Sequence, residues 1–193
     1  MKRLTVAFFL FAAACAPDLR EDYPFDGQVN TGPLVRVEAR EDGSQLVRVD
    51  ASNKGARVYV DLEEGRELKA DEAFATNAWD LSFQRYEVTM NGGGGNPEGK
   101  VSVAVLKDVP YASLQSAPAG GYQQDASEPV FASVEGGWYA YDLSQHKLAP
   151  RPELLYVVKS SEGRFYKLRM LGYYDETGTP GHVSFQYQPL AAP

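Results

Sequence analysis

Alternation of apolar and polar side chains with a period of two dominates the chain from Leu34 onward. In the segment 57–62 one face carries Val58, Val60 and Leu62, and comparable segments lie at 34–40, 46–49, 101–105, 138–141, 154–158, 165–170 and 182–187. Successive side chains of a strand point to opposite faces of its sheet, so this period is typical of half-buried strands. The best helical candidate, residues 67–75, is short. We therefore expect an all-β domain, mainly antiparallel sheet, with at most one or two short helices.

Two segments depart from this regular pattern. In 79–88 the apolar residues hold odd positions up to Phe83 and even positions beyond it, which indicates a β-bulge near Gln84–Arg85 or a strand covered on both faces. Trp79 shares the parity of Phe83, so we expect its side chain to be buried. Residues 108–133 are punctuated by proline and glycine, and we expect a long surface excursion with one short helix at most.

The amino terminus has the pattern of a bacterial lipoprotein. A basic start, an apolar run too short to span a bilayer and three alanines lead to Cys15, which is the only cysteine of the chain. This order resembles a lipobox, in which the cysteine is diacylated and becomes the first residue; an ordinary secretory signal with a stray cysteine is the alternative. Ala16 stands where enteric bacteria place the aspartate that retains lipoproteins at the inner membrane, so we expect the outer membrane. The expected organisation is a signal peptide at 1–14, a flexible tether at 15–33 and a β domain at 34–190.

Charge and composition exclude several classes of function. The formal net charge is −7, which argues against binding to nucleic acid. One cysteine and two histidines provide no cysteine-based zinc site. The segment 94–100 fits G-x-x-x-x-G-K, but Val101 follows in place of serine or threonine and the next segment is a strand, so we expect no nucleotide site. The chain has no G-x-S-x-G nucleophile motif either, and we expect no enzymatic activity.

Several short segments together resemble one known family. They are Val49–Ser52, Val58–Leu62, Ala78–Tyr86, Asn91–Gly93, Gly137–Asp142, His146–Pro150, Tyr156–Val158, Gly163–Leu168, Gly172–Tyr174 and Phe185–Tyr187. In this order and spacing they resemble the HmuY family over roughly residues 34–189. The resemblance implies an all-β, hand-like fold with a cleft between projecting loops. It also implies an outer-membrane lipoprotein that captures haem and delivers it to a TonB-dependent outer-membrane receptor.

The resemblance implies a haem site with a pair of histidines or a pair of methionines as axial ligands, and three residues are candidates. His146 lies in a polar turn from which its imidazole can reach a cleft, or else it packs the turn through a backbone hydrogen bond. His182 begins the last strand, as a ligand or as a solvated strand residue. Met90 precedes the glycine loop, as a thioether ligand or as edge packing. We expect Met170, in mid-strand, to belong to the core.

A porphyrin also requires a flat apolar cleft. Six aromatic residues are candidates for its walls, although they equally suit core and cross-strand pairs: Tyr122, Trp138, Tyr139, Tyr141, Tyr173 and Tyr174. We expect Arg85 to form a structural ion pair with Asp80 or Glu87. The basic partners of the haem propionates stay open at this point.

The sequence thus leads to two hypotheses of function. The first is an outer-membrane or surface lipoprotein of the HmuY type that binds haem, or a similar planar ligand, for uptake without catalysis. The second is an interaction lipoprotein that binds no haem and serves as an accessory subunit of an outer-membrane uptake receptor. Both attach to the membrane through a lipid on Cys15.

Overall fold

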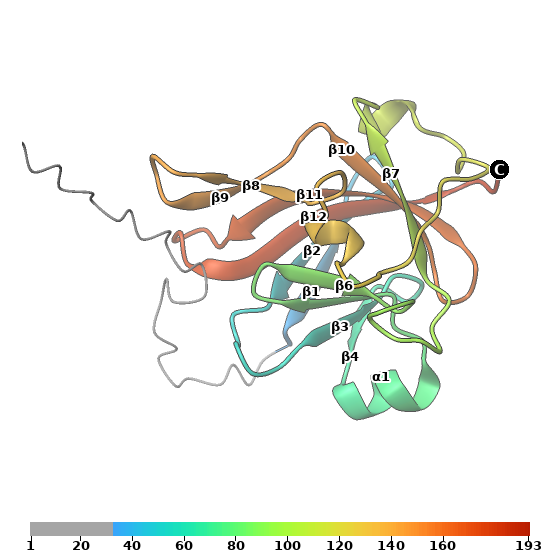
Figure 1. The fold of residues 1–193 in the computed structure, drawn as a ribbon, viewed down its shortest axis with the longest axis horizontal. Coiled ribbons are helices and arrows are strands. Elements are labelled where there is room, and N and C mark those ends of the chain that lie inside the picture. The colour runs from blue at the N-terminus through green and yellow to red at the C-terminus, as the bar shows by residue number, and fades with distance from the viewer. Residues whose placement is uncertain (1–32) are drawn as a thin grey trace, which may run out of the picture.

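The computed structural model describes residues 33–193; the expected signal peptide, Cys15 and nearly all of the expected tether lie outside the described residues. Its strands are β1 (Val35–Ala39), β2 (Gln45–Asp50), β3 (Val58–Asp61), β4 (Arg66–Leu68), β5 (Leu81–Gln84), β6 (Glu87–Met90), β7 (Ser102–Lys107), β8 (Tyr139–Asp142), β9 (Lys147–Pro150), β10 (Leu154–Lys159), β11 (Phe165–Tyr174) and β12 (Pro180–Leu190) (Figure 1). The helical elements of the described part are α1 (Ala70–Thr76) and two 3₁₀ turns, η1 (Tyr111–Ser113) and η2 (Val130–Ala132). The expected all-β fold with at most one or two short helices is confirmed.

The strands form two sheets and a separate hairpin. The larger sheet has the order β1-β2-β12-β11-β10-β7, the smaller has the order β4-β3-β5-β6, and β8 pairs with β9 alone. The named strands all pair antiparallel. The turn at Ser160–Gly163 joins β10 to β11, and the Gly163 amide donates to the Ser160 carbonyl at 3.0 Å.

The main core lies where the two sheets face each other. Phe83 of β5 and Phe185 of β12 stack with their ring centroids 5.5 Å apart and their planes 10° from parallel. Both side chains are fully buried, as is Val47 of β2. Burial of each such side chain contributes about 1.5–3 kcal/mol, so these period-two faces hold the two sheets together.

The segment 79–88 is a hairpin rather than one bulged strand. Gln84 of β5 pairs with Glu87 of β6, which leaves Arg85 and Tyr86 as a two-residue turn. Arg85 adopts a left-handed backbone with φ of 54°, the conformation that tight hairpin turns require. The expected bulge is therefore wrong, whereas the alternative of a strand covered on both faces holds for β5, where Leu81, Ser82 and Phe83 are all buried. Glycine or asparagine normally signals such a turn, and the arginine concealed it.

The β11–β12 hairpin bends near its tip. Its register shifts on both sides of Gly172, between the pairs Met170–Phe185 and Tyr174–Pro180. Such irregularities bend a strand and turn its side chains to the other face, and here they leave Met170 and Tyr173 both buried despite their odd spacing. The tips of this hairpin and of β8–β9 project at the same end of the molecule (Figure 1).

Candidate functional site

The β8–β9 hairpin places His146 at the projecting end. Asp142 pairs with Lys147 across the hairpin, so the loop between them contains four residues, and the carboxylate of Asp142 accepts hydrogen bonds from the amide and hydroxyl of Ser144 at 2.8 and 2.6 Å. These bonds lower the pKa of Asp142. His146 closes the loop with φ of 52°, a left-handed conformation that histidine tolerates better than most residues. The last residue of this loop thus carries an imidazole that is exposed to solvent.

A hollow of about 230 Å³ lies beside this imidazole, and we call it the hairpin cleft. The β8–β9 hairpin, the β5–β6 turn and the tip of the β11–β12 hairpin contribute its walls. Its aromatic lining consists of Tyr86, Tyr141, Tyr173 and Tyr174, and its polar lining includes His146, Arg85 and Lys147. The Leu148 amide donates to the Tyr174 hydroxyl at 2.9 Å, which fastens β9 to β11 close to the loop of the β8–β9 hairpin.

Within residues 33–193, Nδ1 of His146 has a hydrogen-bond partner and Nε2 has none. The Tyr141 hydroxyl lies 3.0 Å from Nδ1 of His146. In the tautomer with the proton on Nδ1, this hydrogen bond leaves the lone pair of Nε2 available to a metal ion. Histidines that ligate metals are usually oriented through their other nitrogen in this way, so the pair has the arrangement of a ligand and its positioning partner.

A continuous set of aromatic rings backs the cleft. Tyr86 contacts Tyr139 and Tyr173 with ring centroids 5.5 and 6.3 Å apart, and Tyr173 contacts Tyr174 at 5.2 Å. Trp138 lies behind them, fully buried, and its indole nitrogen donates to the Tyr86 carbonyl at 2.9 Å. The back wall of the cleft is therefore aromatic, which suits a planar ligand.

Two cations flank this wall. The Arg85 guanidinium lies 5.8 Å from the ring centre of Tyr173, and Nζ of Lys147 lies 5.9 Å from that of Tyr174. Arg85 donates to the carbonyls of Ser52 and Pro180 at 3.4 and 3.3 Å, so the expected ion pair with Asp80 or Glu87 is wrong. Glu87 instead pairs with Arg57 at 3.2 Å. Arg85 and Lys147 thus place positive charge beside the cleft.

His182 lines a different hollow from His146. This second hollow, of about 510 Å³, lies over β1, β2 and β12, and Tyr174 lines both it and the hairpin cleft. The His182 ring nitrogens lie 3.9 Å from Asp50 and 3.9 Å from Asp175. The structure brings the two histidines to one end of the molecule but not into one cleft.

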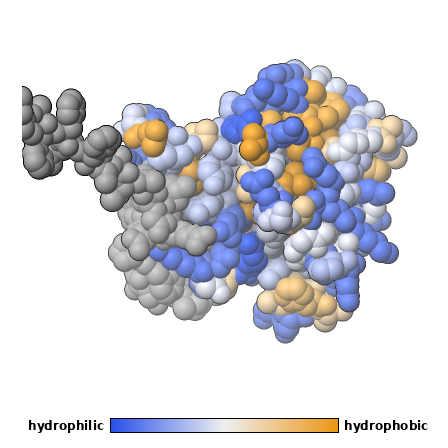
Figure 2. Space-filling model, in the orientation of Figure 1, coloured by the Kyte–Doolittle hydropathy of each residue, from blue (hydrophilic) through white to orange (hydrophobic). Residues whose placement is uncertain are grey.

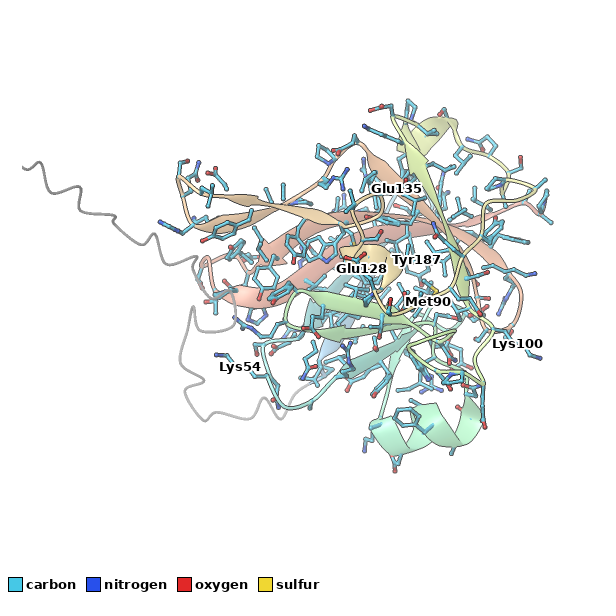
Figure 3. The ribbon with its side chains drawn as sticks, in the orientation of Figure 1. Lys54, Met90, Lys100, Glu128, Glu135 and Tyr187 are labelled. Atoms are coloured by element: carbon cyan, nitrogen blue, oxygen red, sulfur yellow. The ribbon has the colours of Figure 1, made fainter. Side chains whose placement is uncertain are left out.

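Met90 lies away from both histidine sites. It pairs with Leu81 within the smaller sheet and is fully buried in the main core. Figure 3 shows Met90 far from the tip of the β8–β9 hairpin. An iron ion would reach its sulfur only if the sandwich opened, so we leave Met90 out of the proposed site. Met170 is buried in the same core, as the sequence predicts.

The aromatic candidates divide between the cleft and other places. Tyr141, Tyr173 and Tyr174 line the hairpin cleft, whereas Tyr122 packs on Phe165 at 5.8 Å. Tyr139 lines a separate hollow with Arg57 and Pro129. Tyr86 and Lys147 are cleft residues that sequence reasoning did not single out. The turn that carries Tyr86 lacks the glycine or asparagine that would signal it, and nothing in the sequence distinguishes Lys147 apart from its position next to His146.

The fold and the cleft together define a small β-sandwich with a hollow of about 230 Å³ between projecting hairpins. A family model described as HmuY protein matches residues 53–187. The chain belongs to the HmuY family, as the resemblance of its segments predicts.

Solved structures share this fold. An apo HmuY analogue from Tannerella forsythia superposes with a TM-score of 0.58 at 16% identity, covering 75% of this chain and 94% of that chain. A protein described as HmuY-like and heme-binding, from Bacteroides vulgatus, gives 0.53 at 15%, covering 75% and 90%. A protein described as a lipoprotein, from Bacteroides fragilis, gives 0.55 at 20%, covering 78% and 91%.

No curated protein was found to match the sequence. Within residues 33–193, no helix has the length and apolar character needed to cross a membrane.

Proposed function

We propose that this protein is a non-catalytic surface lipoprotein that binds haem for uptake, with the hairpin cleft as its haem site. The observation that carries the proposal is the imidazole of His146, which is held through Nδ1 by Tyr141 at 3.0 Å beside an aromatic wall. Membership of the HmuY family and the likeness to a structure described as heme-binding support the same ligand.

The chemistry of the cleft fits haem on three counts. His146 offers a nitrogen lone pair to iron, as proximal histidines do in haem proteins. The four tyrosines offer apolar faces to the macrocycle. Arg85 and Lys147 offer cations to the propionates.

The size of the cleft limits how much of the haem it encloses, and the position of His182 makes it the candidate for the second axial ligand. A volume of about 230 Å³ is small for a ligand pocket, so the cleft would hold part of the macrocycle and leave the rest toward solvent or a partner. We keep His182 as the candidate for a second axial position, reached from the neighbouring hollow that Tyr174 also lines.

The membrane and receptor steps belong to the same proposal. Cys15, which lies outside the described residues, would carry the lipid that holds the protein at the outer membrane or cell surface. A TonB-dependent outer-membrane receptor is the partner to which haem would pass. The likeness to a protein described as a lipoprotein supports the anchor.

A haemin titration tests the proposal. The full-length protein, purified in detergent, is titrated with haemin while the Soret band is recorded. We expect a shifted Soret band that saturates at one equivalent of haemin. A featureless, non-saturating curve contradicts haem binding.

One observation favours the second function, an accessory subunit of an uptake receptor that binds no haem. Leu143 at the tip of the β8–β9 hairpin is 72% exposed, and Figure 2 shows a hydrophobic spot at this tip. An exposed leucine on a projecting loop is accessible to a protein partner. This function is favoured if the purified protein binds its receptor while the haemin titration stays featureless.

A further inference from the structure

Three acidic side chains meet inside the molecule, away from the hairpin cleft. Asp61 ends β3, Glu63 lies in the turn to β4, and Asp80 directly precedes β5. Each offers a carboxylate oxygen, and these oxygens lie within 4.8 Å of one another. We call this set the acidic cluster. Asp80 is fully buried, Asp61 is 4% exposed and the Glu63 side chain is 3% exposed.

Hydrogen bonds from the backbone fix two of the carboxylates in place. Asp80 accepts from the amides of Leu62 and Ser161 at 2.8 and 2.7 Å, one on each oxygen. One oxygen of Asp61 accepts from the amides of residues 63 and 64 at 2.8 and 3.0 Å. Each carboxylate oxygen has two lone pairs, so the cluster keeps acceptor capacity that these amides do not use.

Glu63 provides the observation that points to a ligand. Its Oε1 accepts from the Ser160 hydroxyl, whereas its Oε2 is buried and has no hydrogen-bond donor among the described residues while Asp80 is ionised; a protonated Asp80 carboxyl would donate to Glu63 in place of a cation. A buried carboxylate oxygen without a donor or cation is costly, because it has lost water and gained nothing in exchange. A carboxylate oxygen of Glu63 lies within 4.8 Å of oxygens of Asp61 and Asp80, so a cation in the cluster would lie beside this side chain.

The charge of the cluster is also unbalanced. Among residues 33–193, the one basic group within 4.0 Å is Arg164, whose Nε lies 3.5 Å from Oε1 of Glu63. The Arg164 side chain is 58% exposed, so water screens its charge. With all three carboxylates ionised, the cluster and Arg164 carry a formal charge of −2, which one divalent cation would neutralise.

We propose that Asp61, Glu63 and Asp80 form a site for a hard divalent cation, with calcium as the ion that fits best. Carboxylate oxygens are the ligands that calcium and magnesium prefer. Calcium binds at 2.3–2.6 Å and tolerates irregular geometry, so oxygens that lie within 4.8 Å of one another can bind the same ion. Magnesium demands a near-ideal octahedron, which amide-fixed carboxylates are poorly able to adopt.

The bound ion would hold the two sheets together at the end of the molecule opposite the tip of the β8–β9 hairpin. The cluster belongs to the smaller sheet, while Ser160, Ser161 and Arg164 come from the β10–β11 turn of the larger sheet. This turn lies at the other end of the molecule from the tip of β8–β9 (Figure 1). Burial raises the pKa of Asp80, and the neighbouring charge of Glu63 raises it further; a cation in the cluster would oppose both effects. The inference is independent of haem.

Calcium binding to the full-length protein in detergent tests the site. The protein is stripped with EDTA, dialysed, and titrated with calcium chloride at neutral pH by isothermal calorimetry and by thermal unfolding. We expect one ion per chain and, at 100-fold excess over Kd, a rise in melting temperature of about 5–10 °C that EDTA reverses. Glu63→Gln keeps the shape of the side chain and removes its charge. We expect this variant to fold in EDTA and to bind calcium with an affinity at least 10-fold weaker than that of the wild type.

The matched control is Glu64→Gln. Glu64 belongs to the same turn, pairs with Arg66 and has a side chain that is 62% exposed, so this variant should respond to calcium as the wild type does. No response of the wild type up to about 10 mM calcium, which exceeds the Kd range of extracellular calcium modules, overturns the proposal. A full response of Glu63→Gln overturns it as well.

Discussion

Replacing Trp79 with alanine should destabilise the domain by about 3–5 kcal/mol. Trp79 is 1% exposed and packs edge-on against Tyr59, with ring centroids 5.2 Å apart, in a small core with Leu68 and Ala73. An aromatic side chain of this size buries about 200 Å², which at about 25 cal/mol per Å² corresponds to about 5 kcal/mol. This area-based figure is an upper bound, because unfolded chains already bury part of their apolar surface.

Trp79→Phe is the control, because the indole nitrogen of Trp79 has no hydrogen-bond partner within the described part of the chain. Phenylalanine keeps an aromatic ring against Tyr59 and loses no hydrogen bond, so we expect a cost below about 2 kcal/mol. Urea unfolding followed by circular dichroism measures both variants. A cost below about 1 kcal/mol for Trp79→Ala with an unchanged m-value would refute the packing argument.

Three other predictions concern the anchor, the cleft and the acidic cluster. Cys15→Ser should abolish lipidation, since only a thiol accepts the diacylglyceryl group; unchanged partitioning into the detergent phase would contradict this. Tyr141→Phe should weaken haem binding about 10-fold or more, because it removes the hydroxyl that orients His146, and it should not lower the melting temperature. A haem affinity equal to that of the wild type would show that the hydrogen bond does not orient the imidazole. In EDTA, the melting temperature should rise as the pH falls from about 7 to about 5. Burial raises the pKa values of Asp80 and Asp61 above those of the unfolded chain, so the folded state binds protons that the unfolded state releases. A melting temperature that stays constant or falls over this pH range would contradict the prediction.

Much of the fold could be predicted from local pattern. The period-two faces of segments such as 57–62 and 182–187 follow from burial of one side of a sheet, and glycine or proline marks many of the turns. The β5–β6 turn escaped prediction because Arg85 occupies its left-handed position. A tight turn and a bulge both switch the parity of a strand, and only the pairing of Gln84 with Glu87 distinguishes them.

The candidate site could be predicted less completely than the fold. His146 was identifiable because a histidine in a polar turn is free to project. Its partners Tyr141, Tyr173 and Arg85 come from three hairpins, and their meeting depends on the register shift at Gly172, which no local pattern reveals. Met90 illustrates the opposite case, since a residue next to a glycine loop suggests an exposed edge but lies in the core.

The most direct measurement of the central proposal is the haem affinity of His146→Asn compared with that of His182→Asn. Asparagine tolerates the left-handed backbone of position 146, where φ is 52°, so the loop should keep its shape while the iron ligand is lost. We predict that haemin titration gives His146→Asn an affinity at least 10-fold weaker than that of the wild type, with a displaced Soret band, and a smaller loss for His182→Asn. Wild-type protein that binds haemin while His146→Asn binds it with equal affinity and the same Soret position would contradict the assignment of the hairpin cleft as the haem site.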